Sequence, residues 1–221
     1  MHHIEVAVPM WLQLVSAVGL AVLLVWMFRG MTWDELFVPG RVQHFVLATL
    51  ALVMIWSLRA ASVDGLAMHF LGVVAVTLVF GWQLAIVMTL LVVGALVVMG
   101  VIDPMLAPLK VLLTGVAPAL ATWGLLRFSE RRLPPHMFIY LYVVGFFGGM
   151  LSVLVVMGGN ALVFGLFTDA PWESIFREYL QYTPLLVLPE GMINGMVITG
   201  LVMFRPEWVA TYSDARYVDG R

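Results

Sequence analysis

Long apolar segments with very few charged side chains dominate this sequence and limit what it can fold into. They occur at about residues 10–28, 43–58, 66–80, 82–101, 106–126, 136–157 and 180–203. An α-helix that crosses the hydrocarbon core of a bilayer needs about 20 predominantly apolar residues. The pattern therefore predicts an all-α fold, a polytopic membrane helical bundle of about seven transmembrane helices, in a single integral membrane domain over residues 1–221.

Composition excludes the main alternatives to a membrane protein. Only 11% of the 221 residues are charged, whereas 62% are hydrophobic. A soluble domain has about a quarter of its residues charged, and disordered chains are also polar and charge-rich, so neither class fits. The net charge of −2 provides no basic patch for phosphates, so we expect no nucleic-acid partner.

Several common catalytic motifs are absent from the sequence. The only lysine, Lys110, lies between Leu109 and Val111 and belongs to no Gly-rich phosphate-binding loop, so this chain itself is not expected to hydrolyse ATP. Neither the HExxH pattern of zinc proteases nor the GxSxG turn of serine hydrolases occurs. Cys is also absent, which excludes disulfides and thiolate ligands. We therefore expect a protein that is not an enzyme.

The distribution of basic residues predicts the orientation in the membrane. With seven spans and the N-terminus outside, eight Lys or Arg residues fall on the inner side and three on the outer side, as the positive-inside rule requires. The inner group is Arg29, Arg41, Arg127, Arg131, Arg132, Arg205, Arg216 and Arg221, and the outer group is Arg59, Lys110 and Arg177. We therefore expect a multi-pass protein of the cell (inner) membrane, with an outer tail at 1–9 that folds back into the bundle and a cytoplasmic tail at 204–221.

Three of the five histidines fall on the outer side in this topology. His2 and His3 lie on the N-terminal tail, and His69 lies a few residues into the helix predicted over 66–80. A tail from His2 to Trp11 can extend about 30 Å, so it can reach His69, which is expected about 5 Å below the outer end of its helix. The remaining two, His44 and His136, open predicted helices at the inner face and are interpreted as interfacial residues.

The N-terminal residues can chelate a transition metal. The sequence has no basic segment or cleavage site typical of a signal peptide, so Met1 is expected to persist. The Met1 amine, the His2 amide and the His2 imidazole offer three nitrogens in fused chelate rings, and His69 can complete a square plane. Such a site suits Ni(II) or Cu(II), and imidazole also suits Co(II). His3 can compete with His69 as the fourth ligand.

Other interpretations remain open from the residues alone. His2 and His3 also fit a solvated tail, and His69 fits a hydrogen-bonded core residue. An intramembrane haem or redox protein would use His44 and His69 as axial ligands, although the predicted topology places them toward opposite faces. A membrane assembly or scaffold protein without a substrate would fit the shortage of polar residues.

The last predicted helix carries Glu190 and, one turn later on the same face, Asn194. A carboxylate within a membrane is expected to be paired, protonated or functional. This pair either joins helices by a hydrogen bond, or orients a liganding histidine or accepts a proton during metal entry. Asp64, just before the third span, either attracts a cation or caps a helix. Gly145 and Gly149 permit close helix packing.

Three stretches, taken in order, resemble a known family. The chain begins Met1-His2, the third segment contains His69-Phe70-Leu71-Gly72 before Gly81-Trp82, and the last segment reads Pro189-Glu190-Gly191-Met192-Ile193-Asn194-Gly195 before Arg205-Pro206. This order resembles the cobalt/nickel permease family of energy-coupling-factor transporters, the CbiM/NikM type, of which the chain is identified as a divergent member.

The resemblance implies the substrate-binding transmembrane subunit of an energy-coupling-factor ABC transporter that takes up Co²⁺ or Ni²⁺. It implies that the Met1 amine, the His2 amide and imidazole and the His69 imidazole hold the transported metal, with no permanent cofactor. It also implies a transmembrane coupling subunit and ATPase subunits as partners, which fits the absence of an ATP-binding loop from this chain.

Overall fold

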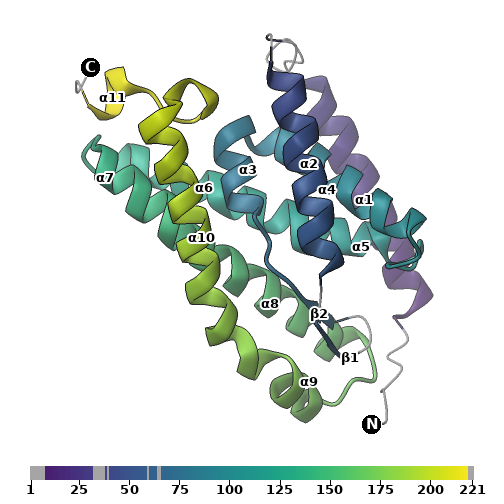
Figure 1. Ribbon diagram of the computed structural model, residues 1–221. Helices are drawn as coiled ribbons and strands as arrows, with labels where there is room; N and C mark the ends of the chain where they lie inside the picture. Colours follow the sequence, from purple (N-terminus) through teal and green to yellow (C-terminus); the bar gives the residue numbers. More distant parts are fainter. Residues whose placement is uncertain (1–7, 32–37, 39, 59, 64–65, 219–221) are drawn as a thin grey trace.

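The computed structural model describes residues 8–31, 38, 40–58, 60–63 and 66–218. These residues form a helical bundle with one short β-hairpin (Figure 1). The elements are α1 (Met10–Arg29), α2 (Arg41–Ser57), β1 (Ala60–Val63), β2 (Leu66–Met68), α3 (Val73–Phe80), α4 (Trp82–Val98), α5 (Ala107–Val111), the π-helical η2 (Leu112–Val116), α6 (Ala117–Arg132), α7 (Met137–Ile139), the π-helical η3 (Tyr140–Phe146), α8 (Phe147–Phe167), α9 (Trp172–Glu178), the 3₁₀ turn η4 (Leu180–Tyr182), α10 (Thr183–Phe204), the 3₁₀ turn η5 (Pro206–Trp208) and α11 (Asp214–Tyr217).

Within the described ranges, four helical stretches are long and apolar enough to cross a membrane: Met10–Arg29, Ala107–Arg132, Met137–Phe167 and Trp172–Phe204. The apolar helices Arg41–Ser57 and Trp82–Val98 are shorter. Six of the seven predicted segments therefore correspond to helices. The prediction for the segment at 66–80 is wrong in its first half.

The segment at 66–80 is a broken element and not one helix. Leu66–Met68 forms strand β2, residues 69–72 belong to no helix or strand, and α3 begins only at Val73. Gly72 stops the helix because it has φ +63°, a left-handed conformation that other residues rarely adopt, and an added Cβ would lie 2.9 Å from Leu52. At about 1.5 Å per residue, α3 is only about 12 Å long, far short of a hydrocarbon core of about 30 Å.

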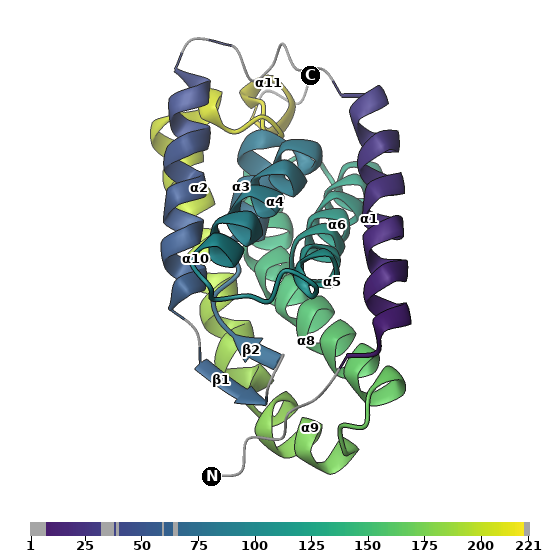
Figure 2. The ribbon, with the colours of Figure 1, turned by 90° about the vertical axis from the view of Figure 1, so that its right-hand side faces the viewer.

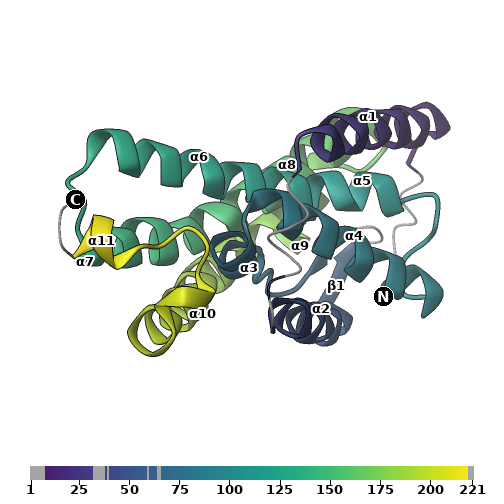
Figure 3. The same cartoon turned by 90° about the horizontal axis from the view of Figure 1, so that it is seen from above.

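Helix α3 lies at the centre of the bundle, where it contacts α4, α6, α8 and α10 (Figure 3). Val73, Val74 and Leu78 on this helix are fully buried. Gly81, with φ +88°, separates α3 from α4 in a tight turn. Extended backbone at membrane depth is tolerated only where protein surrounds it, because lipid cannot satisfy its hydrogen bonds. The central position of α3 meets this requirement.

Different elements lie at the two ends of the bundle. The hairpin β1–β2 and helix α9 lie at one end, together with the start of α1 (Figure 2). The opposite end holds the last turn of α10 and α11 (Figure 1). Residues 205–217, part of the predicted cytoplasmic tail, are folded there: the backbone N–H groups of Ala210 and Thr211 donate to the carbonyls of Val79 and Leu78 at 3.0 and 3.2 Å.

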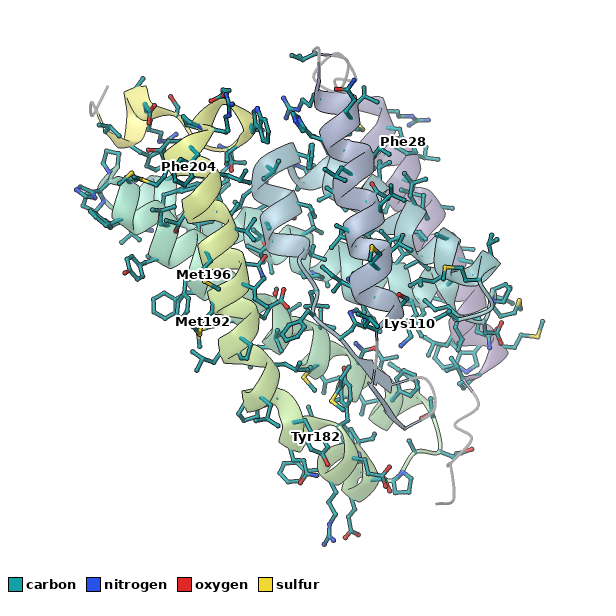
Figure 4. All side chains as sticks on the ribbon, viewed as in Figure 1. Phe28, Lys110, Tyr182, Met192, Met196 and Phe204 are labelled. Carbon is teal, nitrogen blue, oxygen red and sulfur yellow. The ribbon has the colours of Figure 1, made fainter. Side chains whose placement is uncertain are left out.

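The outer surface of the bundle is apolar. Met192, Met196 and Phe204, which are labelled in Figure 4, lie on α10 and are 48%, 61% and 83% exposed. Exposed apolar side chains also cover much of α1 and α2. Large contiguous apolar surface is rare on soluble monomers. It is the surface expected of helices that face lipid, in agreement with the predicted membrane fold.

Candidate metal-binding site around His69

His69 lies on the stretch between β2 and α3, and not inside a helix as the sequence predicts. Its ring lies 4.7 Å from that of Trp56, centroid to centroid, and its Nδ1 lies 3.0 Å from the carbonyl oxygen of Phe70. Because a carbonyl can only accept, Nδ1 donates in this bond, and Nε2 carries the lone pair of the neutral ring. Metal-binding histidines commonly make such a bond with their second nitrogen.

A small cavity of about 10 Å³ adjoins His69. That volume suits about one water-sized species. Its wall is formed by β2 and the segment after it, by α8, by the residue between α9 and η4, and by α10. The lining residues are Met68, His69, Leu71, Val153, Val156, Met157, Tyr179 and Leu186. Apart from His69 and Tyr179, these side chains are apolar or thioether groups, so the imidazole is the main nitrogen donor at this cavity.

Glu190 holds the backbone that follows His69. From α10, its Oε2 accepts the N–H of Leu71 at 2.9 Å, and its Oε1 accepts the N–H of Gly72 at 2.7 Å. The Glu190 side chain is only 1% exposed. The carboxyl group also lies at the N-terminal end of α3, where amide N–H groups have no acceptor within the helix. Glu190 thus fixes the segment that carries His69 and the helix that follows it.

Asn194 extends this clamp by one turn of α10. Its Oδ1 accepts the N–H of Ala75 at 2.9 Å, and its Nδ2 donates to Glu190 Oε1 at 2.7 Å and to the Glu190 carbonyl at 2.8 Å. Asn194 is completely buried. Glu190 and Asn194 are therefore hydrogen-bonded to each other, and together they accept three backbone N–H groups from residues 71–75, just after His69.

Trp56 binds the same segment from α2. Trp56 lies in the last turn of α2, and its side chain is only 2% exposed. Its Nε1 donates to the carbonyl of Leu71 at 3.0 Å. Leu71 therefore has both backbone groups bound by buried side chains, one from α2 and one from α10. This pairing satisfies the backbone of Leu71, which lies outside any helix or strand within the apolar bundle.

Two glycines set the position of Glu190. Gly149 on α8 faces Gly191 on α10, and a Cβ added to Gly149 would lie 2.8 Å from both the Glu190 carbonyl oxygen and Gly191 Cα. A Cβ on Gly191 would lie 2.9 Å from the carbonyl oxygen of Phe146. The close packing predicted for Gly149 is therefore confirmed. It brings the backbone of Glu190 directly against α8.

The other predicted ligands, Met1, His2 and His3, lie outside the described residues, as does Asp64. The chain enters the described region at Val8, which is buried, and α1 begins nearby. Trp11, in the first turn of α1, packs edge-on against Phe167 at the end of α8, with ring centroids 5.5 Å apart. The start of α1 therefore lies at the same end of the bundle as the β-hairpin (Figure 2).

The remaining histidines lie away from this site. His44, in the first turn of α2, has its ring 3.9 Å from that of Trp208, and His136 accepts a hydrogen bond from the N–H of Phe138 at 3.2 Å. His44 and Trp56 are separated by about 18 Å along α2, so His44 and His69 cannot bind one haem iron between them. Within the described part of the chain, no group of three or more His, Cys, Asp or Glu side chains is placed to hold a metal.

Sequence reasoning missed several parts of the site. The Trp56 contact, the amides of Leu71 and Gly72 and the thioethers beside His69 carry no recognisable motif. One signal was available: a glycine three residues after His69 inside an otherwise apolar run indicates a break in the helix. A broken segment beside an intramembrane carboxylate would have pointed to Glu190 as the cap.

Comparison with known proteins places this geometry in context. Comparison with curated proteins yields no match. A crystal structure of a truncated transition-metal transporter superposes with a TM-score of 0.76 at 13% identity, covering 92% of this chain and 99% of that one. A second transition-metal transporter gives 0.75 at 14% identity, covering 92% and 93%. These likenesses establish the fold.

The sequence itself identifies the family. The sequence model of the CbiM family, described as the cobalt uptake substrate-specific transmembrane region, matches residues 2–208. This range contains His69, Glu190, Asn194 and every helix from α1 to α10. The chain is therefore a membrane protein of the CbiM family, whose members are transporter components and not classical enzymes.

Proposed function

We propose that this protein is the substrate-binding transmembrane subunit of an energy-coupling-factor transporter for the uptake of Co²⁺ or Ni²⁺. The observation that carries the proposal is the placement of His69. Its imidazole adjoins a water-sized cavity on a segment whose backbone is bound by buried side chains from two helices. Family membership and the transition-metal transporters of the same fold support this assignment.

The metal is bound, in this proposal, by the Met1 amine, the His2 amide and imidazole and the His69 imidazole, with His3 as a competing ligand. A segment of seven residues before Val8 extends at most about 25 Å. The start of α1 lies at the same end of the bundle as the segment that carries His69 (Figure 2). Nickel(II) and cobalt(II) both accept nitrogen ligands of this kind. The metal is the transported substrate, and no permanent cofactor is required.

Glu190 and Asn194 have a positioning role in this proposal. A metal site gains affinity when its ligands are held in the bound geometry before the metal arrives. Glu190 binds the amides two and three residues after His69, and Asn194 binds the amide of Ala75. Asp64, which precedes β2, is proposed to attract the cation toward the site.

The broken element at 66–80 still counts as a crossing in this proposal. Residues 66–71 can add at most about 20 Å to the roughly 12 Å of α3, together about the thickness of the hydrocarbon core. Seven crossings put the two termini on opposite sides of the cell membrane, and the distribution of basic residues favours the N-terminus outside and the C-terminus inside. A reporter fused at Asp219 should read as cytoplasmic, and a periplasmic signal there would contradict this orientation.

Uptake requires partners. This chain has no ATP-binding loop, so a transmembrane coupling subunit and ATPase subunits are proposed to supply the energy. Co-purification of the chain with such subunits from its native membrane is the expected result.

The chelate is tested by extending the chain by one residue before Met1. The extension moves the amine and breaks the fused rings while every side chain remains. We expect isothermal titration with Ni(II) and Co(II) to give at least about a tenfold lower affinity for the extended protein. Equal affinities of the extended and unextended proteins would contradict a ligand role for the Met1 amine.

A further inference from the structure

A second site lies at the end of the bundle opposite His69. A cavity of about 380 Å³ is enclosed there by the start of α4, the end of α6 and the folded residues 210–217. Its wall includes Thr77, Trp82, Trp123, Arg127, Glu130 and Arg216. None of these side chains takes part in the proposed metal site, so the cavity requires a separate explanation.

Two guanidinium groups meet at one carboxylate in this cavity. Arg127 Nη1 lies 3.0 Å from Glu130 Oε2, and Arg216 Nη1 lies 3.2 Å from Glu130 Oε1. The Glu130 side chain is 12% exposed, whereas those of Arg127 and Arg216 are 52% and 42% exposed. Each guanidinium has five N–H donors, and one carboxylate cannot saturate both groups. The cluster therefore has a net positive charge and spare donors, which is the chemistry that binds a second anion.

Tryptophans place this cluster at the depth of lipid headgroups. The ring of Trp82 lies 6.1 Å from that of Trp26 on α1 and 5.9 Å from that of Trp123 on α6. Trp26 and Trp123 are 64% and 38% exposed on the outer surface. Tryptophan rings concentrate at the membrane–water interface. The guanidinium of Arg127 lies 5.6 Å from the centroid of the Trp123 ring, which joins this aromatic row to the basic cluster.

A buried hydroxyl on the cavity wall indicates where a ligand oxygen would bind. Thr77 is 2% exposed, and its hydroxyl has no hydrogen-bond partner among the described residues. A buried polar group without a partner is costly, and such groups are rare in folded proteins. An oxygen-rich ligand in the cavity would satisfy it.

We infer that this cavity binds the phosphate headgroup of an acidic phospholipid. Arg127 and Arg216 bind the phosphodiester, and their net positive charge favours acidic over zwitterionic headgroups. The row of Trp26, Trp82 and Trp123 places the acyl chains alongside α1 and α6. Basic pockets between transmembrane helices bind acidic lipids in this way. The site would bind lipid whether or not a metal is present at His69.

The test compares lipid binding by charge-matched variants. The detergent-solubilised protein is titrated with phosphatidylglycerol and with phosphatidylcholine, and bound lipid is counted by native mass spectrometry. Arg127→Gln/Arg216→Gln should lower the preference for phosphatidylglycerol by about tenfold or more, because the charge-assisted hydrogen bonds to the phosphate are lost. Arg131→Gln/Arg132→Gln removes the same charge from the same end of α6 but outside the cavity wall, and should retain the preference.

A third variant gives an effect of opposite sign that misfolding cannot mimic. Glu130→Gln removes the competing carboxylate and should raise the preference for phosphatidylglycerol severalfold. Equal losses in the two double variants, or an unchanged preference in Arg127→Gln/Arg216→Gln, would overturn the inference. Stabilisation by inorganic phosphate as strong as that by phosphatidylglycerol at the same concentration would also overturn it, since it would identify a site for soluble anions.

Discussion

The two ends of helix α3 are held in different ways. At its N-terminal end, buried side chains of α10 bind the amides of Leu71, Gly72 and Ala75. At its C-terminal end, the carbonyls of Leu78 and Val79 accept hydrogen bonds mainly from the backbone of residues 210 and 211. Side-chain bonds depend on single residues, whereas backbone bonds survive most substitutions. The end that carries His69 should therefore be sensitive to mutation, and the opposite end tolerant.

The largest effect is expected for Glu190→Ala. The substitution leaves two buried amides without acceptors, so it should lower the free energy of unfolding by about 2–5 kcal/mol and the affinity for Ni(II) by about 10–100-fold. Thermal unfolding in detergent and calorimetric titration measure the two effects.

The matched control is Glu173→Ala on α9, which removes an exposed carboxylate paired with Arg177 at 3.0 Å. Exposed pairs contribute little, so neither stability nor affinity should change appreciably. Similar losses for both variants would show that Glu190 has no special role at the N-terminal end of α3.

A smaller effect is expected for Gly149→Ala, which acts on Glu190 from α8. The new Cβ would lie 2.8 Å from the Glu190 carbonyl oxygen, so α8 and α10 must separate. We expect the free energy of unfolding to fall by about 1–3 kcal/mol and the metal affinity to fall severalfold. Gly158→Ala on the same helix has nothing within 4 Å of its new Cβ and should instead stabilise the helix by about 0.5–1 kcal/mol. If both variants have the same melting temperature, the helix contact does not position Glu190.

The smallest effect is expected at the other end of α3. Thr211→Val removes the hydroxyl that lies 2.8 Å from the Leu78 carbonyl and 2.7 Å from the Tyr140 hydroxyl, while the backbone bonds of residues 210 and 211 remain. We expect a loss of about 1–2 kcal/mol in stability and a metal affinity within about twofold of the unmodified protein. A large loss of metal affinity would remove the contrast between the two ends.

Most helices were predictable because an apolar run of span length has few other solutions in a membrane. The helices at 10–29, 41–57 and 82–98 begin and end close to the predicted runs. The segment at 66–80 was not predictable in this way, because its hydropathy is that of a helix while its conformation depends on partners more than a hundred residues away. Leu71 and Gly72 stay outside the helix because Glu190 supplies the acceptor that a helical turn would otherwise provide.

Three polar residues of the candidate site could be selected from the sequence, but the way they are connected could not. His69, Glu190 and Asn194 stand out because polar groups in apolar segments are few. Their connection through the amides of residues 71, 72 and 75 could not be predicted. Every residue except proline has a backbone amide, so the sequence does not show which amides a side chain binds. Trp56 lies near the end of α2, a position typical of an interfacial ring, and only the fold shows that the ring turns inward to Leu71.

The central claim is that the imidazole of His69 binds the transported metal. Calorimetric titration of the purified protein with Ni(II) and Co(II) tests it most directly, with His69→Ala compared with His136→Ala. His136 is the matched control because it caps a helix through the N–H of Phe138 and lies outside the proposed site. We predict that His69→Ala lowers the affinity for both metals by at least about 10–100-fold, while His136→Ala leaves it unchanged. Unchanged affinity of His69→Ala for both metals would contradict the claim.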